Sequence, residues 1–163
     1  MVGSAADSGV CWPPPLIILG GLFCGGLMDA AVITLFEPGF WGPGPWMGPR
    51  VLLGLGVLLV GSGLALWALW RILRARTPLL WFRLAETLIQ DGPFAWSRNP
   101  IYTGLMMGYV GLAVALGAWI SLLLGWVVFR LLRDKVVRIE ERGLERRFGE
   151  SYRAYARRVR RWL

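Results

Sequence analysis

The sequence contains no histidine and only two cysteines among its 163 residues. The absence of histidine excludes a histidine general base, a histidine-containing metal site and a Cys–His catalytic pair. Cys11 and Cys24 have neither the spacing of a metal site nor that of a thioredoxin-like pair. We therefore expect no metal centre.

Charged residues are also scarce. They make up 17% of the chain, against about 25% in ordinary globular proteins. Hydrophobic residues make up 56%, and the mean hydropathy is +0.54. This composition excludes a disordered chain, a disulfide-rich secreted module and a conventional water-soluble enzyme. It predicts a single domain that is embedded in a lipid bilayer.

The first half of the chain has almost no basic residues. Residues 1–70 contain one, Arg50, and three acidic residues, whereas residues 71–163 contain 17 basic and seven acidic residues. The pI near 10.7 does not indicate nucleic-acid binding, because the positive charge flanks apolar runs long enough to cross a bilayer. The positive-inside rule instead places both termini in the cytoplasm.

Apolar runs and helix breakers divide the chain into eight segments. Residues 16–36 and 51–70 each have the length of a membrane span. The run 101–132 is too long for one span, at roughly 48 Å as a helix, and Gly117 divides it into a hairpin. The predicted segments are a leader (1–15) that is not a cleaved signal peptide, span 1 (16–36), an external Pro/Gly-rich loop (37–50), span 2 (51–70), a cytoplasmic loop (71–98), span 3 (99–117), span 4 with its extension (118–147) and an amphipathic tail (148–163).

The tail has an aromatic face. Phe148, Tyr152, Tyr155, Val159 and Trp162 recur at helical spacing, and arginines occupy the other face. Such a helix, which Gly149 separates from the one before it, is expected to lie on an anionic cytoplasmic leaflet. The predicted fold is thus an all-α integral membrane protein with about four transmembrane helices, the last two forming a hairpin, and a C-terminal amphipathic cytoplasmic helix.

Two features of the spans have more than one interpretation. Asp29 is the one ionisable residue of the first span; we favour a capping or pairing role over a functional one. Several glycines would allow helices to approach closely. In the second span these glycines are Gly54, Gly56, Gly61 and Gly63. In the third span, Gly104 and Gly108 are expected to pack helices within the chain, and dimerisation is the alternative.

Asn99 and Pro100 mark the start of a helix, since asparagine is a favoured N-cap and proline suits the first turn. The free backbone N–H groups there, with Arg98 beside them, would suit a carboxylate or phosphate. The alternative is an ordinary start of a membrane helix.

A second polar cluster follows the fourth span. Glu140 falls on one helix face at the mouth of the bundle, where its carboxylate would bind an amine or a pair of sugar hydroxyls; the other members of this face are Arg130, Arg133, Val137 and Leu144. Arg130 and Arg133 are weak candidates for substrate binding. The alternative is a solvated helix surface with the ion pairs Arg138–Glu141 and Arg142–Glu145.

These two stretches together resemble a known family. They read GPFAWSRNPIYTG (92–104) and EERGLERRFGESYRAYARRVRRWL (140–163). This order, spacing and tail are similar to the isoprenylcysteine carboxyl methyltransferase and phospholipid methyltransferase superfamily, over about residues 76–163. Its usual pattern is G-[PV]-[YF], then R-H-P-x-Y-x-G, a helical hairpin, E-E-x-x-L, F-G and Y-x-x-Y.

The resemblance implies an S-adenosylmethionine-dependent methyltransferase with the cofactor at the cytoplasmic end, under the hairpin and a C-terminal lid. The loop 71–98 then becomes a cofactor loop. The residues that the resemblance assigns to the cofactor are Glu86, Thr87, Leu88, Ile89, Phe94, Arg98, Asn99, Pro100, Ile101, Tyr102, Glu140 and Glu141, with Tyr152 and Leu79 as weaker candidates. No catalytic residue is assigned.

One position departs from the family pattern, because Asn99 stands where the motif usually has histidine. Asparagine can cap a helix and form hydrogen bonds, but it cannot carry a charge or shuttle a proton. This favours cofactor binding over proton transfer at Asn99.

The predicted function is methyl transfer to a lipophilic acceptor in a bacterial inner membrane, with an isoprenylcysteine-type carboxylate favoured. Phospholipid amine N-methylation and methylation of a small thiol or phenol are the alternatives within the enzyme class. The alternative of another class is a non-catalytic lipid-binding or assembly protein with the same fold.

Overall fold

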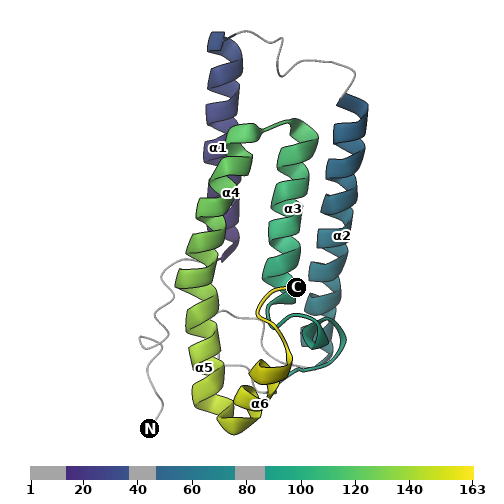
Figure 1. Cartoon of the computed structure of the whole chain (residues 1–163), viewed down its shortest axis with the longest axis vertical. Helices are drawn as coiled ribbons and strands as arrows, with labels where there is room; N and C mark the ends of the chain where they lie inside the picture. The colour runs from purple at the N-terminus through teal and green to yellow at the C-terminus, as the bar shows by residue number, and fades with distance from the viewer. Residues whose placement is uncertain (1–13, 37–46, 76–86) are drawn as a thin grey trace.

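The computed structural model describes residues 14–36, 47–75 and 87–163, and every regular element in them is helical. The leader 1–13, the loop 37–46 and residues 76–86 lie outside this description. Figure 1 shows an up-and-down bundle that is extended at one end. Its elements are α1 (Pro14–Phe36), α2 (Met47–Arg74), a 3₁₀ turn η2 (Gly92–Ala95), α3 (Pro100–Leu116), α4 (Trp119–Leu132), a π-helical turn η3 (Arg133–Val137), α5 (Arg138–Phe148) and α6 (Glu150–Arg158).

Two helices, α1 and α2, have the length and apolar character to cross a membrane. Their apolar stretches cover Pro14–Leu35 and Met47–Arg74, with hydropathies of 2.1 and 2.2. α3 is apolar but has 17 residues, and α4 has 14, fewer than the roughly 20 that a perpendicular span needs. The all-helical prediction is confirmed, and the count of four spans stays a prediction.

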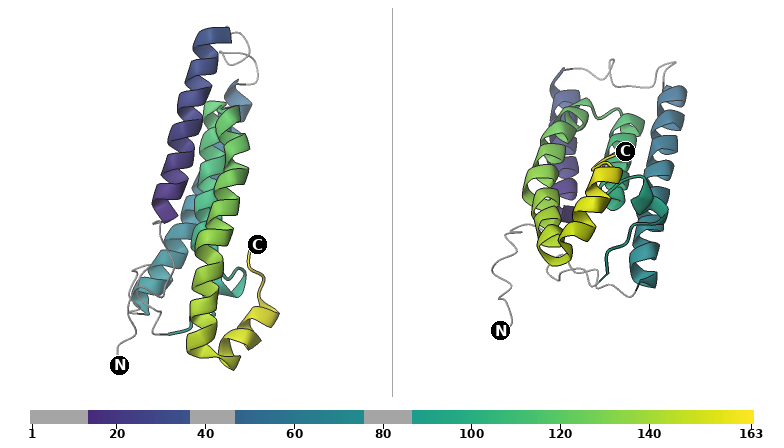
Figure 2. Two further views of the ribbon diagram at one scale, coloured as in Figure 1. Left: turned by 90° about the vertical axis from the view of Figure 1, so that its left-hand side faces the viewer. Right: turned by 60° about the horizontal axis from the view of Figure 1, so that its bottom comes forward.

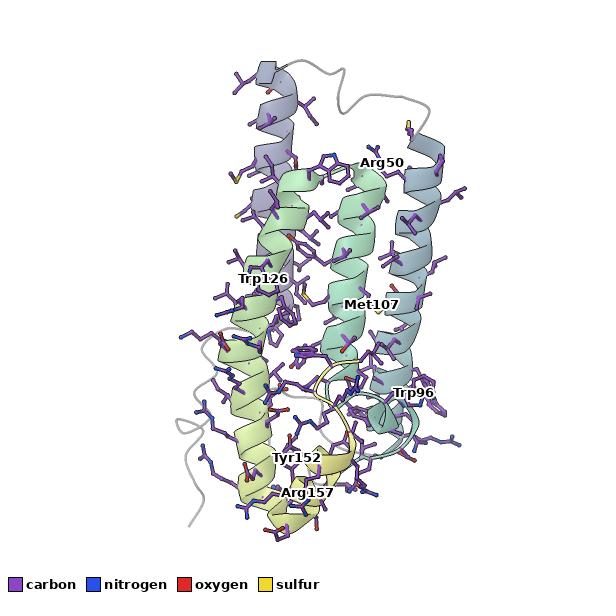
Figure 3. All side chains as sticks on the ribbon, in the orientation of Figure 1. Arg50, Trp96, Met107, Trp126, Tyr152 and Arg157 are labelled. Atoms are coloured by element: carbon purple, nitrogen blue, oxygen red, sulfur yellow. The ribbon has the colours of Figure 1, made fainter. Side chains whose placement is uncertain are left out.

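The predicted hairpin at Gly117 is confirmed. Gly117 has a φ of 68°, a left-handed conformation that suits glycine. The N–H of Ala118 reaches back to the carbonyl of Ala113 at 2.8 Å, which ends α3 in a Schellman-type turn. Arg50 at the start of α2 lies over this turn (Figure 3), where its charge complements the C-terminal dipole of α3.

The second predicted span begins earlier and ends later than expected. Its helix runs from Met47 to Arg74 instead of over residues 51–70. Pro49 lies in its first turn, where a missing N–H costs no hydrogen bond, so residues 47–50 of the predicted Pro/Gly-rich loop are helical.

α2 and α3 pack through glycines, but only half of the predicted ones. A Cβ on Gly61 would come within 2.6 Å of the carbonyl oxygen of Gly104, and one on Gly54 within 2.6 Å of that of Gly111. Gly56 and Gly63 face open space, because a residue two positions away lies on the opposite side of a helix. Gly104 therefore packs within the chain, as the favoured interpretation expects.

Asp29 has the structural role that we favoured. It is 5% exposed, and it accepts hydrogen bonds from the backbone N–H groups of Ile120 and Ser121, both at 3.0 Å, and from the Ser121 hydroxyl at 2.9 Å. These N–H groups belong to the first turn of α4, whose orphan donors and positive dipole end favour a carboxylate. Asp29 thus fastens α1 to α4.

The amphipathic tail differs from its prediction. Gly149, with a φ of 52°, separates two helices as expected, but α6 ends at Arg158 instead of continuing to residue 163. Tyr152 and Tyr155 are 4% and 3% exposed, so the aromatic face packs inside the protein and does not lie free for a leaflet. Residues 159–163 return toward α3 (Figure 2, right), and Trp162 contacts Phe129 with ring centroids 5.1 Å apart.

Candidate functional site

Polar contacts concentrate at one end of the molecule, which we call the charged end. It comprises residues 87–99, the first turn of α3, the whole of α5 and α6, and residues 159–163, which we call the strap. Figure 3 shows side chains with nitrogen and oxygen gathered there, below the mostly carbon-bearing bundle. The two sequence stretches that carry the family resemblance meet at this end, as their placement on the hairpin predicts.

The most direct contact between these stretches joins Tyr102 to Glu140. The Tyr102 hydroxyl donates to the Glu140 Oε1 at 2.7 Å, which links α3 to α5. Burial raises the pKa of Glu140 to about 7; the hydrogen bond from Tyr102 opposes this rise and the charge of Glu141 adds to it. The carboxyl group of Glu140 therefore changes its charge near neutral pH.

Glu141 has the opposite environment, with two arginines around it. Its Oε1 lies 3.2 Å from an amino group of Arg98. Arg161 donates to its Oε2 from Nε at 3.0 Å and from a terminal amino group at 2.6 Å. The expected pair Arg138–Glu141 is wrong, because Glu141 is turned toward the loop and the strap. Adjacent residues on a helix point about 100° apart, so one carboxylate meets a tyrosine and the next meets two arginines.

The other expected ion pair on α5 is also replaced. Glu145 accepts from the Nε of Arg153 at 2.8 Å, instead of pairing with Arg142. Arg138 pairs with Asp134 at 3.1 Å. The surface of α5 is therefore tied to α6 and to the preceding turn.

The helix start at Asn99 and Pro100 is confirmed, but Asn99 does not cap with its side chain. α3 begins at Pro100, and no side chain caps its N-terminus. The Nδ2 of Asn99 donates instead to the carbonyl oxygen of Arg161 at 3.3 Å. The strap competes for this side chain, so the predicted N-cap hydrogen bond is wrong.

Ser97 is a residue of the site that sequence reasoning missed. It is fully buried, donates to the carbonyl oxygen of Arg161 at 3.1 Å and accepts the N–H of Asn99 at 3.1 Å. Its place two residues before Asn99 was the available signal, since serine often bonds to a backbone N–H two residues on. Ser97 and Asn99 together anchor the strap over the first turn of α3.

Two further contacts hold the loop 92–98 to the C-terminal segments. The N–H of Arg98 donates to the carbonyl oxygen of Arg160 at 2.9 Å. The hydroxyl of Tyr155 donates to the carbonyl oxygen of Phe94 at 2.7 Å. The N-terminal end of α3, expected to be open to an anion, is therefore flanked by strap carbonyl groups. The remaining predicted residues, Pro100 and Ile101, form the first turn of α3.

The middle of the predicted cofactor loop lies beside the end of α2. Thr87, Leu88 and Ile89 line a cavity of about 440 Å³ together with Arg71 and Arg74. This cavity is joined to α6 through Arg158, which donates to the Oε1 of Gln90 at 2.9 Å. Glu86 and Leu79 lie outside the described residues.

Arg130 and Arg133 are not brought to Glu140. The Nε of Arg133 donates to Asp134 at 3.0 Å, and Arg130 lies 4.0 Å from the same carboxylate. The π-helical turn η3 spans Arg133–Val137. It contains more residues than an α-helical turn, and it shifts the register between Arg133 and Glu140, so the predicted common face of these residues is wrong.

Comparison with known proteins assigns the chain to a family. Residues 49–151, from the first turn of α2 to the first turn of α6, match the sequence model of the phospholipid methyltransferase family. This is well over half of the chain, and the chain therefore belongs to that family. The predicted methyltransferase family membership is confirmed.

A curated methyltransferase matches part of the chain. The chain is 33% identical over 72 residues to the protein-S-isoprenylcysteine O-methyltransferase of Schizosaccharomyces pombe (strain 972 / ATCC 24843). The match covers 44% of this chain and 30% of the relative, so the chain spans well under half the length of that protein. No solved structure matches.

Proposed function

We propose that this chain is a membrane-embedded enzyme that transfers a methyl group from S-adenosylmethionine to a lipophilic acceptor, with an isoprenylcysteine-type carboxylate favoured. The hydrogen bond between Tyr102 and Glu140 carries the proposal. It joins, in one partly buried place, the two segments whose motifs resemble the methyltransferase superfamily. Family membership supports the reaction class, and the curated relative supports a carboxylate acceptor.

The residues present fit such a cofactor. Glu140 is partly buried, and among the described residues its hydrogen-bond donor is Tyr102, with no cation paired to it. A ligand ammonium group or ribose diol would complete its contacts, because a buried carboxylate is stable only with donors or a positive charge. When bound, S-adenosylmethionine supplies a methyl group already activated by its sulfonium.

The other residues of the proposed site serve position and exclusion of water. Phe94 and Tyr102 would wall the cofactor, and the strap would cover it. Such alignment is the main demand of a reaction whose donor is already reactive. The residues proposed to hold the cofactor are Glu86, Thr87, Leu88, Ile89, Phe94, Arg98, Asn99, Pro100, Ile101, Tyr102, Glu140 and Glu141.

The chemistry of the chain supports a carboxylate acceptor. A carboxylate is ionised at neutral pH and needs no base before it attacks. A phospholipid amine must first lose a proton, and the chain has no histidine to accept it. Phospholipid amine N-methylation nevertheless stands as the second candidate, because the matching family is described as phospholipid methyltransferase.

The proposed setting is a bacterial inner membrane with both termini in the cytoplasm. α1 and α2 supply two helices of sufficient length and hydropathy. Seventeen of the 18 basic residues follow residue 70. The positive-inside rule associates such an excess of basic residues with the cytoplasmic side.

The test of cofactor binding is calorimetry of the full chain in detergent with S-adenosylhomocysteine. The wild type should bind, and Glu140→Ala should weaken binding by at least about tenfold, as expected for loss of a charged hydrogen-bond partner. Glu150→Ala, which removes an exposed carboxylate of α6, is the control and should bind like the wild type. A folded wild type that does not bind would refute the proposal and favour a non-catalytic lipid-binding or assembly role.

The acceptor is tested with methyl-labelled S-adenosylmethionine and two lipids offered separately. One is an S-farnesylated cysteine with a free carboxyl group, and the other is phosphatidylethanolamine in mixed micelles. A product whose label is released by alkali is a methyl ester, as the proposal requires. Alkali-stable label on phosphatidylethanolamine alone would assign the chain to N-methylation.

A further inference from the structure

A second polar cavity lies between α5 and α6 and shares Arg98 and Glu141 with the proposed site. Its volume is about 360 Å³, within the size range of small-molecule sites. The positive residues that line it are Arg98, Arg138, Arg142, Arg153 and Arg161, against two carboxylates, those of Glu141 and Glu145. Glu140 is not part of its lining. The cavity therefore has an excess of positive charge.

Two buried donors at this cavity have no hydrogen-bond partner among the described residues. They are the Nε of Arg98 and the hydroxyl of Tyr152, and both residues line the cavity. Tyr152 is 4% exposed, so water does not readily satisfy its hydroxyl. Burial raises the pKa of Tyr152 to about 12, which keeps this hydroxyl protonated as a donor. An unsatisfied buried donor points to a missing acceptor.

The arginines around these donors are already held in place. Arg153 is fixed by Glu145 and Glu150, both at 2.8 Å, and Arg138 is fixed by Asp134 at 3.1 Å. These pairs restrain the long side chains and neutralise part of their charge, but the five lining arginines still outnumber the carboxylates of Asp134, Glu141, Glu145 and Glu150. Restraint of this kind lowers the entropy lost when a ligand binds.

We propose that this cavity binds a phosphate-bearing anion. Phosphate oxygens are strong acceptors, and they match both the guanidinium forks and the orphan donors of Arg98 and Tyr152. The excess positive charge opposes a cationic ligand, so the cavity is not a second site for the sulfonium cofactor. The phosphate belongs either to the headgroup of an anionic lipid or to a free ion, and the experiment separates these sources.

The experiment measures binding of inorganic phosphate to the delipidated full chain in neutral detergent, by calorimetry at fixed ionic strength and without cofactor. Tyr152→Phe should lower the affinity about tenfold, because it removes one hydrogen bond to a charged group. Arg138→Gln combined with Arg142→Gln should lower it by more. Since Arg98 also belongs to the proposed cofactor site, it is left intact.

The matched control is Arg146→Gln combined with Arg147→Gln. This pair removes the same charge from the same helix, but neither residue lines the cavity, so its affinity should stay within about twofold of the wild type, the difference reflecting only screened long-range charge. Equal losses in both double variants, or no loss in Tyr152→Phe, would show general charge attraction and overturn the proposal.

A second arm distinguishes the two sources. Short-chain phosphatidylglycerol is titrated beside phosphatidylcholine of the same chain length. Tighter binding of phosphatidylglycerol than of inorganic phosphate, with the same loss in Tyr152→Phe, identifies a lipid headgroup. Binding of inorganic phosphate that equals or exceeds that of phosphatidylglycerol identifies a free anion. Failure of all three probes against a folded wild type rejects the site, whatever the outcome for S-adenosylhomocysteine.

Discussion

The α2–α3 seam and the charged end are held together in opposite ways. In the seam, backbones approach each other because side chains are missing, as at Gly61 against Gly104. At the charged end, side chains reach far along the sequence, as in Tyr102 to Glu140 and Asn99 to Arg161. The seam thus depends on shape, and the charged end depends on a few long-range polar contacts.

This difference has a consequence for function. A glycine seam has no polar group that could exchange a partner, so it can serve as a rigid frame. Polar contacts of the charged end can be exchanged for ligand contacts, and several of them involve residues that line a cavity or the strap, as in Glu141 to Arg161 and Asn99 to Arg161. We therefore expect substitutions in the seam to affect folding, and substitutions at the charged end to affect ligand binding as well.

The largest effect is expected from Gly61→Val. Its side chain would collide with the backbone of α3, and overpacking of this kind should destabilise the protein by about 3 kcal/mol, the upper end of the usual range. Gly63→Val is the matched control, because nothing lies within 4 Å of its Cβ position. Thermal unfolding in detergent measures both. Equal stability of the two variants would contradict the packing of α2 on α3.

A smaller effect is expected from Glu141→Gln, which leaves Arg98 and Arg161 without their shared carboxylate. Loss of one partner of a buried ion pair costs ~3–5 kcal/mol, and we expect about 2 kcal/mol here because the side chain of Arg161 is 35% exposed. The strap should also become more accessible, and limited proteolysis near the C-terminus measures this. If Glu150→Gln, at an exposed position, exposes the strap as much, Glu141 does not anchor it.

The same difference explains how much could be predicted from the sequence. Features governed by neighbours in the chain were predicted correctly: the turn at Gly117, the break at Gly149 and the helix start at Pro100. The meeting of the two motif stretches followed from the hairpin. The partners of Glu141 and Asn99 were not predictable from helical spacing, because both depend on where the strap returns. Nor does any local pattern mark the π-helical turn that moves Arg133 out of register with Glu140.

The third prediction concerns the pH dependence that the raised pKa of Glu140 gives to ligand binding and stability. Because the pKa of Glu140 is about 7, S-adenosylhomocysteine affinity should fall by up to about tenfold per unit as the pH drops below 7, since the ligand ammonium needs the ionised carboxylate. Ligand-free stability should show the opposite trend. The unfolded chain loses this proton near pH 4.5 and the folded chain near 7, so stability declines as the pH rises between them.

Glu140→Gln tests both parts of this prediction. It should remove the decline in ligand-free stability over this range and should leave S-adenosylhomocysteine binding weak and independent of pH. Calorimetry and thermal unfolding between pH 5 and 8 measure the two effects. A wild type whose affinity does not change over this range would show that Glu140 does not contact the ligand's cation.

The smallest effects are expected at two tyrosines on the same face of α6. Tyr155 donates to the carbonyl oxygen of Phe94 at 2.7 Å, whereas the hydroxyl of Tyr152 has no partner among the described residues. Tyr155→Phe should therefore cost about 1 kcal/mol of stability, and Tyr152→Phe should be neutral or slightly stabilising in the absence of a ligand. Thermal unfolding measures both variants, first without and then with inorganic phosphate. If phosphate makes Tyr152→Phe less stable than the wild type, the hydroxyl of Tyr152 binds the ligand. If the two variants lose stability equally without phosphate, this hydroxyl already stabilises the fold, as the contacts of the seam do.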